Sequence, residues 1–118
     1  MTLDEIKDFL GQDWKDTDAL IRSSLESDIS LLNATNKAIL DHSGKQLRPI
    51  VSLLVARACG GGRVNADSVR YAAAAELLHN ATLLHDDVAD SSCERRGAPT
   101  VMAILGGPAS VLLGDFWL

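Results

Sequence analysis

The feature that most constrains the fold is an uninterrupted segment between residues 66 and 90. It contains no glycine or proline, and Ala72 to Ala75 form a run of four strong helix formers. Asn65 stands just before it, where a side-chain oxygen can cap the first turn of a helix. The segment therefore predicts one long helix, whose alanines allow close approach by its neighbours.

The composition of the chain also favours helices. Hydrophobic residues make up 47% of the sequence but aromatic residues only 4%, so alanine and leucine carry most of the apolar content. Both residues form helices well and strands poorly. We therefore expect an all-α fold. The formal net charge of −5 argues against a nucleic-acid partner, because general nucleic-acid binders need a positive field.

Helix start and stop signals predict further helices before the long one. Thr2 and Glu5 form a capping-box pattern for a short helix that ends at Gly11. Another helix is expected from Pro49 to about Cys59. Between these two, one longer helical region is expected from its stripe of apolar residues, which are Leu20, Ile21, Leu25, Ile29, Leu32, Ile39 and Leu40.

The region after residue 90 is apolar but interrupted. Ser91 to Pro99 is expected to form a loop, and two short helices should meet at Gly106-Gly107-Pro108. Because of these interruptions, no transmembrane segment is predicted. The acidic N-terminus lacks the basic start and apolar core of a signal peptide, and a cytoplasmic location is expected.

The last three residues, Phe116-Trp117-Leu118, are large and apolar, without a capping glycine or a polar tail. This ending predicts that the sequence was cut from a longer protein. Partly uncovered apolar faces are then expected around Leu53, Leu77, Leu84, Leu113, Phe116 and Trp117. Such faces favour self-association into a homo-oligomer, with a dimer as the simplest case.

The most informative residues for chemistry lie at the C-terminal end of the long helix. Asp86, Asp87 and Asp90 are spaced so that three carboxylates are predicted to converge there. Their mutual repulsion and the helix dipole call for a bound cation, and hard oxygen ligands favour Mg²⁺. The alternative is a solvated acidic helix end that pairs with Arg95 or Arg96.

Basic residues form two groups that suit a phosphorylated ligand. Arg95 and Arg96 offer planar forks that match phosphate oxygens. Lys45 and Arg48 flank a loop-to-helix junction, where backbone N–H groups also favour anions. His79 lies two helical turns before the aspartates on the same face. The plain alternatives are a solvated loop for Arg95 and Arg96, a basic turn for Lys45 and Arg48, and a buried core histidine for His79.

The order and spacing of four segments resemble the trans-isoprenyl (polyprenyl) diphosphate synthase family. They are GKQLRP from Gly44, HNATLLHDDVAD from His79, RRGAPT from Arg95 and LLGDF from Leu112. The resemblance is looser before Gly44. It implies a truncated N-terminal part of the isoprenoid synthase helical fold, within an incomplete domain over residues 1–118. N-terminal helices would occupy residues 1–43, and diphosphate- and metal-binding helices residues 44–118.

The resemblance also implies a role for each of these side chains. Asp86 and Asp90 match ligands of Mg²⁺ ions that bridge to an allylic diphosphate, and Asp87 matches a residue that acts by charge and hydrogen bonds. Arg95 matches the arginine that contacts the allylic diphosphate. The site for isopentenyl diphosphate is matched by Lys45, Arg48, His79 and Arg96.

The implied activity is that of a Mg²⁺-dependent prenyltransferase, which condenses the two diphosphates. In this family the residues just before the first aspartate form a floor for the growing chain. Ala81 and Thr82 are small, which implies a long-chain product, although Leu78 one turn deeper is large enough to limit it. The family's second aspartate-rich motif has no match, since the only acidic residues after Asp90 are Glu94 and Asp115. The chain alone is therefore expected to be inactive.

Two other hypotheses remain open from the sequence. The chain could be a non-catalytic regulatory or partner subunit of a heteromeric prenyl diphosphate synthase. It could also be a helical interaction module whose acidic helix end is coincidental. Magnesium-dependent binding of a bisphosphonate would count against the second of these.

Overall fold

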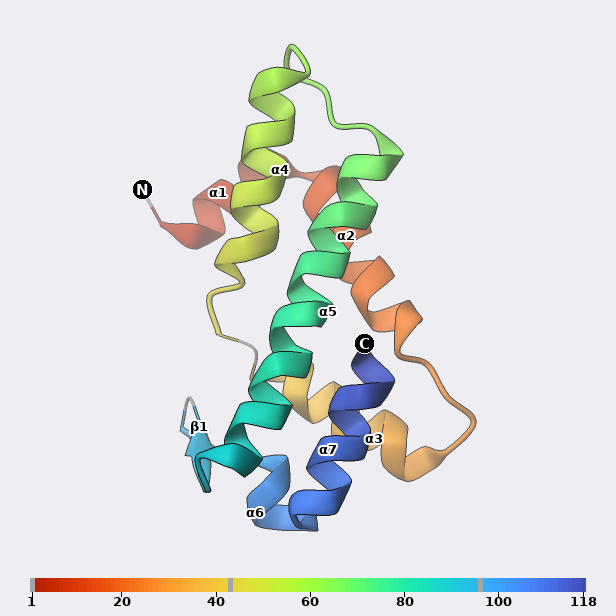
Figure 1. Ribbon diagram of the computed structural model, residues 1–118. Helices are drawn as coiled ribbons and strands as arrows, with labels where there is room; N and C mark the ends of the chain where they lie inside the picture. The colour runs from red at the N-terminus through yellow and green to blue at the C-terminus, as the bar shows by residue number, and fades with distance from the viewer. Residues whose placement is uncertain (1, 43, 96) are drawn as a thin grey trace. The chain divides into compact units, whose positions relative to one another are not determined.

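The computed structural model describes residues 2–42, 44–95 and 97–118, in which helices dominate (Figure 1). In this part of the chain the helices are α1 (Leu3–Leu10), α2 (Gln12–Ser24), α3 (Ser30–Asp41), α4 (Leu47–Cys59), α5 (Ala66–Ala89), α6 (Val101–Leu105) and α7 (Gly107–Trp117). The expected all-α fold is confirmed. Among the residues described, none of the helices combines the length and apolar character that a membrane crossing requires.

The chain divides into two compact units that alternate along the sequence. The first unit comprises Met1–Glu26 and Lys45–Glu76, and the second comprises Ser27–Gly44 and Leu77–Leu118. The first therefore holds α1, α2, α4 and the first half of α5. The second holds α3, the second half of α5, α6 and α7. The candidate aspartates and Arg95 all belong to the second unit.

Helix caps in the first unit follow the sequence signals. The Thr2 hydroxyl accepts a hydrogen bond from the Glu5 backbone N–H at 3.2 Å, and α1 stops at Gly11, whose φ is +58°. The Asn65 side-chain oxygen accepts the Ser68 N–H at 2.8 Å, as an N-cap should. The helix boundaries predicted at these positions are confirmed.

The core of the first unit is made by apolar residues from α1, α4 and α5. Leu10, Ile50, Leu53 and Ala72 are at most 2% exposed. Partly buried residues pack around them, namely Leu3, Ile6, Trp14, Leu54, Val64 and Val69. Ala72 supports the expectation that small side chains on the long helix permit close packing.

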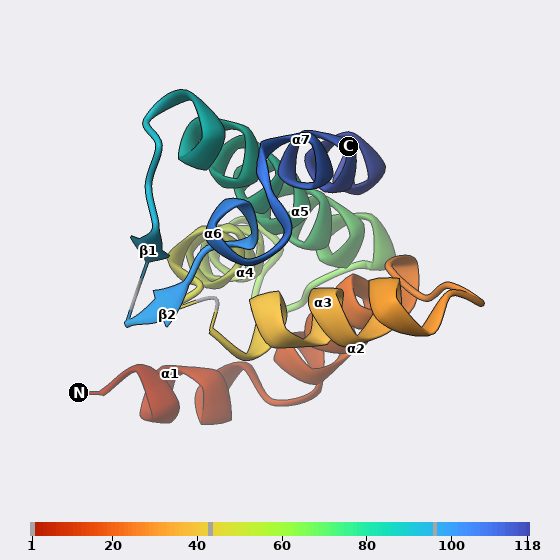
Figure 2. The same ribbon diagram turned by 90° about the horizontal axis from the view of Figure 1, so that it is seen from below.

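In the second unit, α7 runs beside the second half of α5 (Figure 2). The buried Ser110 hydroxyl donates to the Leu84 carbonyl oxygen at 2.8 Å. The Trp117 indole N–H donates to Asn36 Oδ1 on α3 at 2.9 Å. These contacts connect α7 to two other helices of its unit.

The expected uncovered apolar faces are only partly present. Leu53, Leu84, Leu113 and Trp117 are 0–7% exposed, so the prediction was wrong for these four residues. In the second unit the reason is that one side of α7 packs against neighbouring helices, and this packing buries the residues on both. Phe116, on the other side of α7, is 44% exposed, as predicted.

The single helical region expected after Gly11, with its apolar stripe from Leu20 to Leu40, is instead two helices, α2 and α3. They are separated at residues 25–29, where side chains compete for backbone groups. The Asn33 side chain accepts the Ser27 N–H at 2.9 Å and donates to the Ser27 carbonyl oxygen. The Ser27 hydroxyl also accepts the Ile29 N–H at 3.1 Å. Local bonds of this kind replace those of a continuous helix.

The segment expected to be a plain loop between Ser91 and Pro99 contains two short strands. These are β1 (Glu94–Arg95) and β2 (Ala98–Pro99), which pair antiparallel with Arg95 opposite Ala98. Gly97 between them has a φ of +77°, which glycine adopts without strain. The expectation of a plain loop was therefore wrong at this position, and the strand pair fixes the backbone of Arg95.

Candidate active site

The C-terminal end of α5 presents the three candidate aspartates. Asp90 directly follows the helix, and its N–H donates to the Asp86 carbonyl oxygen at 2.8 Å. The Ser92 N–H donates to the Asp87 carbonyl at 2.9 Å and the Ser91 N–H to that of Val88 at 3.2 Å, with Ser91 at a φ of +52°. This is the hydrogen-bond pattern of a Schellman cap. The backbone that carries the aspartates therefore has a defined end.

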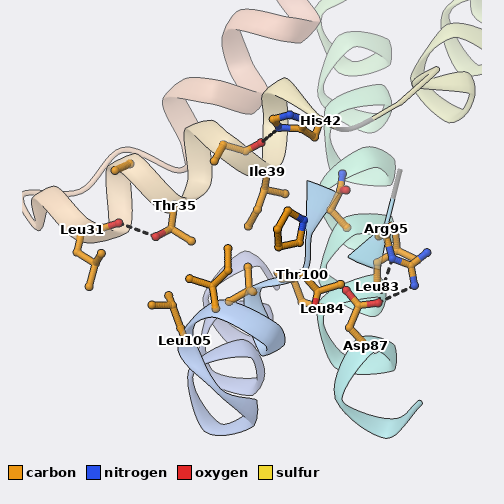
Figure 3. Close-up of a pocket in the computed structure, with 16 residues that line it drawn as sticks. Leu31, Thr35, Ile39, His42, Leu83, Leu84, Asp87, Arg95, Thr100 and Leu105 are labelled. Carbon is orange, nitrogen blue, oxygen red and sulfur yellow. Dashed lines mark hydrogen bonds and ion pairs between the residues drawn. The ribbon is translucent and has the colours of Figure 1, made fainter. Parts of the chain in front are cut away.

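Asp87 faces a different environment from the other two aspartates. Its Oδ1 accepts hydrogen bonds from Arg95 Nε at 3.0 Å and Arg95 Nη2 at 2.7 Å (Figure 3). The Asp87 side chain is 6% exposed and that of Arg95 is 35% exposed. The carboxylate is thus compensated by a charge-assisted pair. The alternative reading of the sequence, an ion pair to a following arginine, holds for Asp87.

Asp86 and Asp90 are exposed, one helical turn apart. Within residues 2–42, 44–95 and 97–118, no group of three or more His, Cys, Asp or Glu side chains could hold a metal ion. The predicted convergence of three carboxylates was therefore wrong, because Asp87 is turned to Arg95. Mg²⁺ commonly uses one or two carboxylates with water and phosphate oxygens. The donor chemistry of Asp86 and Asp90 fits that mode.

An apolar pocket of about 400 Å³ lies beside the Asp87–Arg95 pair in the second unit (Figure 3). Its walls come from α3, α5, α6 and the residues just before α6. Asp87 and Arg95 bond to each other, and three further polar wall groups contact nearby backbone. Thr35 donates to the Leu31 carbonyl at 2.8 Å, Thr100 donates to that of Ser92 at 2.7 Å, and His42 Nδ1 lies 2.9 Å from the Ala38 carbonyl. The pocket consequently suits an apolar group.

The predicted isopentenyl diphosphate residues are divided between the two units. Lys45 and Arg48 are exposed in the first unit, and Arg48 is the second residue of α4. Gln46 between them has a left-handed backbone with a φ of +54°. His79 is half-buried on α5 in the second unit. Arg96 lies outside the described residues.

The three residues predicted to set product length do not share one environment. Leu78 is 55% exposed, and Thr82 is also exposed, with its hydroxyl donating to the His79 carbonyl at 2.6 Å. Ala81 has no exposed surface. On a helix, positions 78 and 82 lie on the same side. Leu78 and Thr82 therefore share one exposed side of α5, whereas the Ala81 side chain is buried.

Contacts between α5 and α7 were not foreseen from the sequence. His85 Nε2 lies 3.1 Å from Asp115 Oδ1 and 3.1 Å from the Val111 carbonyl oxygen. Gly114 lies against the same ring. One signal was present in the sequence, because a glycine within an expected helix is destabilising and often marks a close contact.

A protein-family model described as Polyprenyl synthetase matches residues 29–118. The chain therefore belongs to the polyprenyl synthetase family, as the motifs predicted. It is 45% identical to octaprenyl diphosphate synthase of Escherichia coli, an alignment that covers 98% of this chain and 35% of that protein. It is 40% identical to an all-trans-nonaprenyl-diphosphate synthase of Rhodobacter capsulatus, with 98% and 36% covered.

Solved structures agree with this assignment. A decaprenyl diphosphate synthase from Rhodobacter capsulatus superimposes with a TM-score of 0.88 at 36% identity. A polyprenyl synthase from Caulobacter crescentus, complexed with calcium and isoprenyl diphosphate, gives 0.86 at 37% identity. Each match covers 98% of this chain and 35% of the other. The chain thus spans about a third of the length of these relatives.

Proposed function

We propose that this chain is the N-terminal portion of a cytoplasmic, long-chain trans-polyprenyl diphosphate synthase. The synthase would join an allylic diphosphate to isopentenyl diphosphate. The observation that carries this proposal is that, in a member of this family, the three aspartates have two different environments. Asp86 and Asp90 are exposed one turn apart, while Asp87 is held by Arg95.

The reaction has a simple balance of bonds. The bond from the allylic C1 to the diphosphate oxygen breaks, and the diphosphate leaves with the electron pair. The double bond of isopentenyl diphosphate supplies the electrons for the new carbon–carbon bond, and a proton is then lost. The demand on the protein is to stabilise negative charge on the leaving group and to position two substrates.

Asp86 and Asp90 are the proposed ligands of Mg²⁺. When bound, this ion neutralises charge on the departing diphosphate. Arg95 would serve the same diphosphate with N–H groups outside the Asp87 pair, since a guanidinium carries five donors and Nη1 takes no part in that pair. Asp87 holds the guanidinium in place and keeps its own charge compensated.

Lys45, Arg48, His79 and Arg96 are the proposed contacts to isopentenyl diphosphate. This part of the proposal is supported by the match of their motifs to the family. The exposure of Lys45 and Arg48 is compatible with it, because a diphosphate needs reachable cations. Lysine and arginine both bind phosphate oxygens well.

A long-chain product is proposed from two observations. The side chain of Thr82 is small and exposed one turn before Asp86. Relatives with 98% of this chain aligned include octaprenyl, nonaprenyl and decaprenyl diphosphate synthases at 36–45% identity, and a geranylgeranyl diphosphate synthase at 34% identity. Leu78, one turn before Thr82 on the same side of α5, is the proposed limit on product length. Ala81 is proposed to contribute because its small side chain leaves space where α5 packs on its neighbours.

The test compares the chain with the full-length synthase. Each is incubated with farnesyl diphosphate, labelled isopentenyl diphosphate and Mg²⁺, and products are separated by length. We expect long-chain products from the full-length protein only, because the chain has no second acidic cluster after Asp90. A full-length protein that makes no prenyl product would refute the enzyme and favour the partner-subunit hypothesis.

A further inference from the structure

The LLGDF segment has no role in the proposed chemistry, yet its helix contacts the turn that carries the aspartates. Ser110, which lies two residues before this segment, is fully buried. Its hydroxyl donates to the carbonyl oxygen of Leu84, two residues before Asp86, at 2.8 Å. This bond ties the backbone of the aspartate turn to α7.

The His85 ring makes the second connection. Its Nε2 lies 3.1 Å from both the Val111 carbonyl oxygen and Asp115 Oδ1. Both partners are acceptors, so Nε2 must carry the proton in this arrangement. Because His85 immediately precedes Asp86, holding its ring on α7 restrains the rotation of the turn.

Gly114 gives the ring its space. A β-carbon at this position would lie 2.5 Å from His85 Cδ2 and Nε2, and 3.2 Å from the Ala81 carbonyl oxygen. The first distance is far below van der Waals contact, and the second involves backbone that has little freedom to move. Any larger residue would therefore displace the ring, the helix or both.

We propose that Ser110, Gly114 and Asp115 form a clamp on α5 that positions Asp86 and Asp90 for Mg²⁺, with His85 as the positioning residue. The inference rests on the proposed function for its metal. Asp86 and Asp90 move together, because the Asp90 N–H bonds to the Asp86 carbonyl at 2.8 Å. A small rotation of this turn would thus change the spacing of both carboxylates relative to a bound diphosphate.

The test variant is Gly114→Ala, with Gly107→Ala as its matched control. Both substitutions are made in α7, but a β-carbon at Gly107 would meet only Val88 Cγ1 at 3.6 Å, an ordinary contact. Asp115→Asn is a conservative partner, since its amide oxygen can still accept from His85. Ser110→Ala removes only the hydrogen bond to Leu84, and it serves as a second variant in case Gly114→Ala does not fold.

Two measurements separate positioning from general destabilisation. Amide hydrogen exchange of residues 84–90 reports the clamp without any activity. The Mg²⁺ concentration for half-maximal turnover of the full-length synthase reports the metal site, and a smaller folded fraction leaves it unchanged. In Gly114→Ala we expect faster exchange and a Mg²⁺ requirement raised about 10-fold or more, the usual scale for lost support of a metal ligand.

The control variant Gly107→Ala should match the wild type, and KM for isopentenyl diphosphate should stay unchanged in Gly114→Ala. Asp115→Asn keeps an acceptor for His85, so its amide exchange over residues 84–90 should stay slow. Unchanged exchange in Gly114→Ala and Ser110→Ala would overturn the clamp. Faster exchange with a normal Mg²⁺ requirement would overturn its positioning role. An inactive wild-type synthase would instead refute the proposed function, and the exchange data would still decide whether the clamp exists.

Discussion

Three aspartates of one motif occupy two kinds of environment in this chain. The Asp87 side chain is 6% exposed and accepts two hydrogen bonds from Arg95, whereas Asp86 and Asp90 face solvent. A buried carboxylate that already has a cation is poorly placed to take a metal. Identical side chains therefore have different environments, and the difference depends on the turn that returns Arg95 to the helix.

The pair between Asp87 and Arg95 predicts an asymmetric response to substitution. Arg95→Met keeps the apolar stem but leaves the buried carboxylate unpaired, and should lower the free energy of unfolding by roughly 2–3 kcal/mol. Asp87→Asn keeps an acceptor for an arginine that also reaches water, and should cost roughly 1 kcal/mol. Urea unfolding of the chain measures both values. Equal losses would contradict the burial argument.

Lys45 and Arg48 are predicted to serve substrate affinity rather than the chemical step. Alanine at either position in the full-length synthase should raise KM for isopentenyl diphosphate and leave kcat nearly unchanged. An interaction that is equally strong in ground and transition states behaves in this way. Steady-state kinetics with each substrate varied provide the check. A selective loss of kcat would show that these cations act on the reacting bond instead.

Helix ends were the elements most predictable from sequence. Thr2, Gly11 and Asn65 each act through a short-range backbone preference, so their effect is visible without the fold. The break between α2 and α3 was not predictable in the same way. It depends on Asn33 bonding back to Ser27, while the apolar stripe continues across the break.

Only the part of the candidate site that depends on residue spacing could be predicted from the sequence. The positions of Asp86 and Asp90 one turn apart follow from the helix alone. The burial of Asp87 requires Arg95, whose return depends on the strand pair that the sequence did not indicate. The α7 contacts were hidden because α7 is apolar on most sides, so its pattern does not show which face is buried.

The N-cap of α5 offers a test at the level of one element. Asn65→Ala removes the acceptor of the Ser68 N–H and should lower the free energy of unfolding by about 1 kcal/mol. Asn65→Ser retains an acceptor at the same position and should recover most of this loss. Urea unfolding followed by circular dichroism compares the two variants. No difference between them would mean that the cap does not stabilise the long helix.

Large apolar side chains on the second unit remain open to solvent. Residues on α3, α6 and α7 that are 39–68% exposed include Leu31, Ile104, Leu105, Val111, Leu112 and Phe116. Burial of apolar surface contributes about 25 cal/mol per Å², which favours association through this set. The basis for the predicted homo-oligomer is therefore this set, rather than the residues that the fold buries.

We expect the chain to form a dimer or larger oligomer in solution. Leu112→Lys places a charge in the exposed set and should shift the species towards monomer. Tyr71→Lys, a change at a 74% exposed residue of the first unit, should leave the oligomer unchanged. Light scattering on a size-exclusion column measures the mass of each. A monomeric wild-type chain would contradict the expectation.

The central claim concerns the whole enzyme, namely that its turnover depends on the exposed carboxylates at the end of α5. Asp86→Ala in the full-length synthase removes a proposed metal ligand, whereas Asp67→Ala removes an exposed carboxylate at the other end of the same helix. Loss of stabilisation for a leaving group lowers kcat by about 10²–10³.

The deciding measurement is kcat for isopentenyl diphosphate incorporation at saturating substrates and Mg²⁺. The account predicts a fall of about 10²-fold or more for Asp86→Ala, with KM changed far less, and near-normal turnover for Asp67→Ala. Near-normal turnover of Asp86→Ala would contradict the assignment of this site.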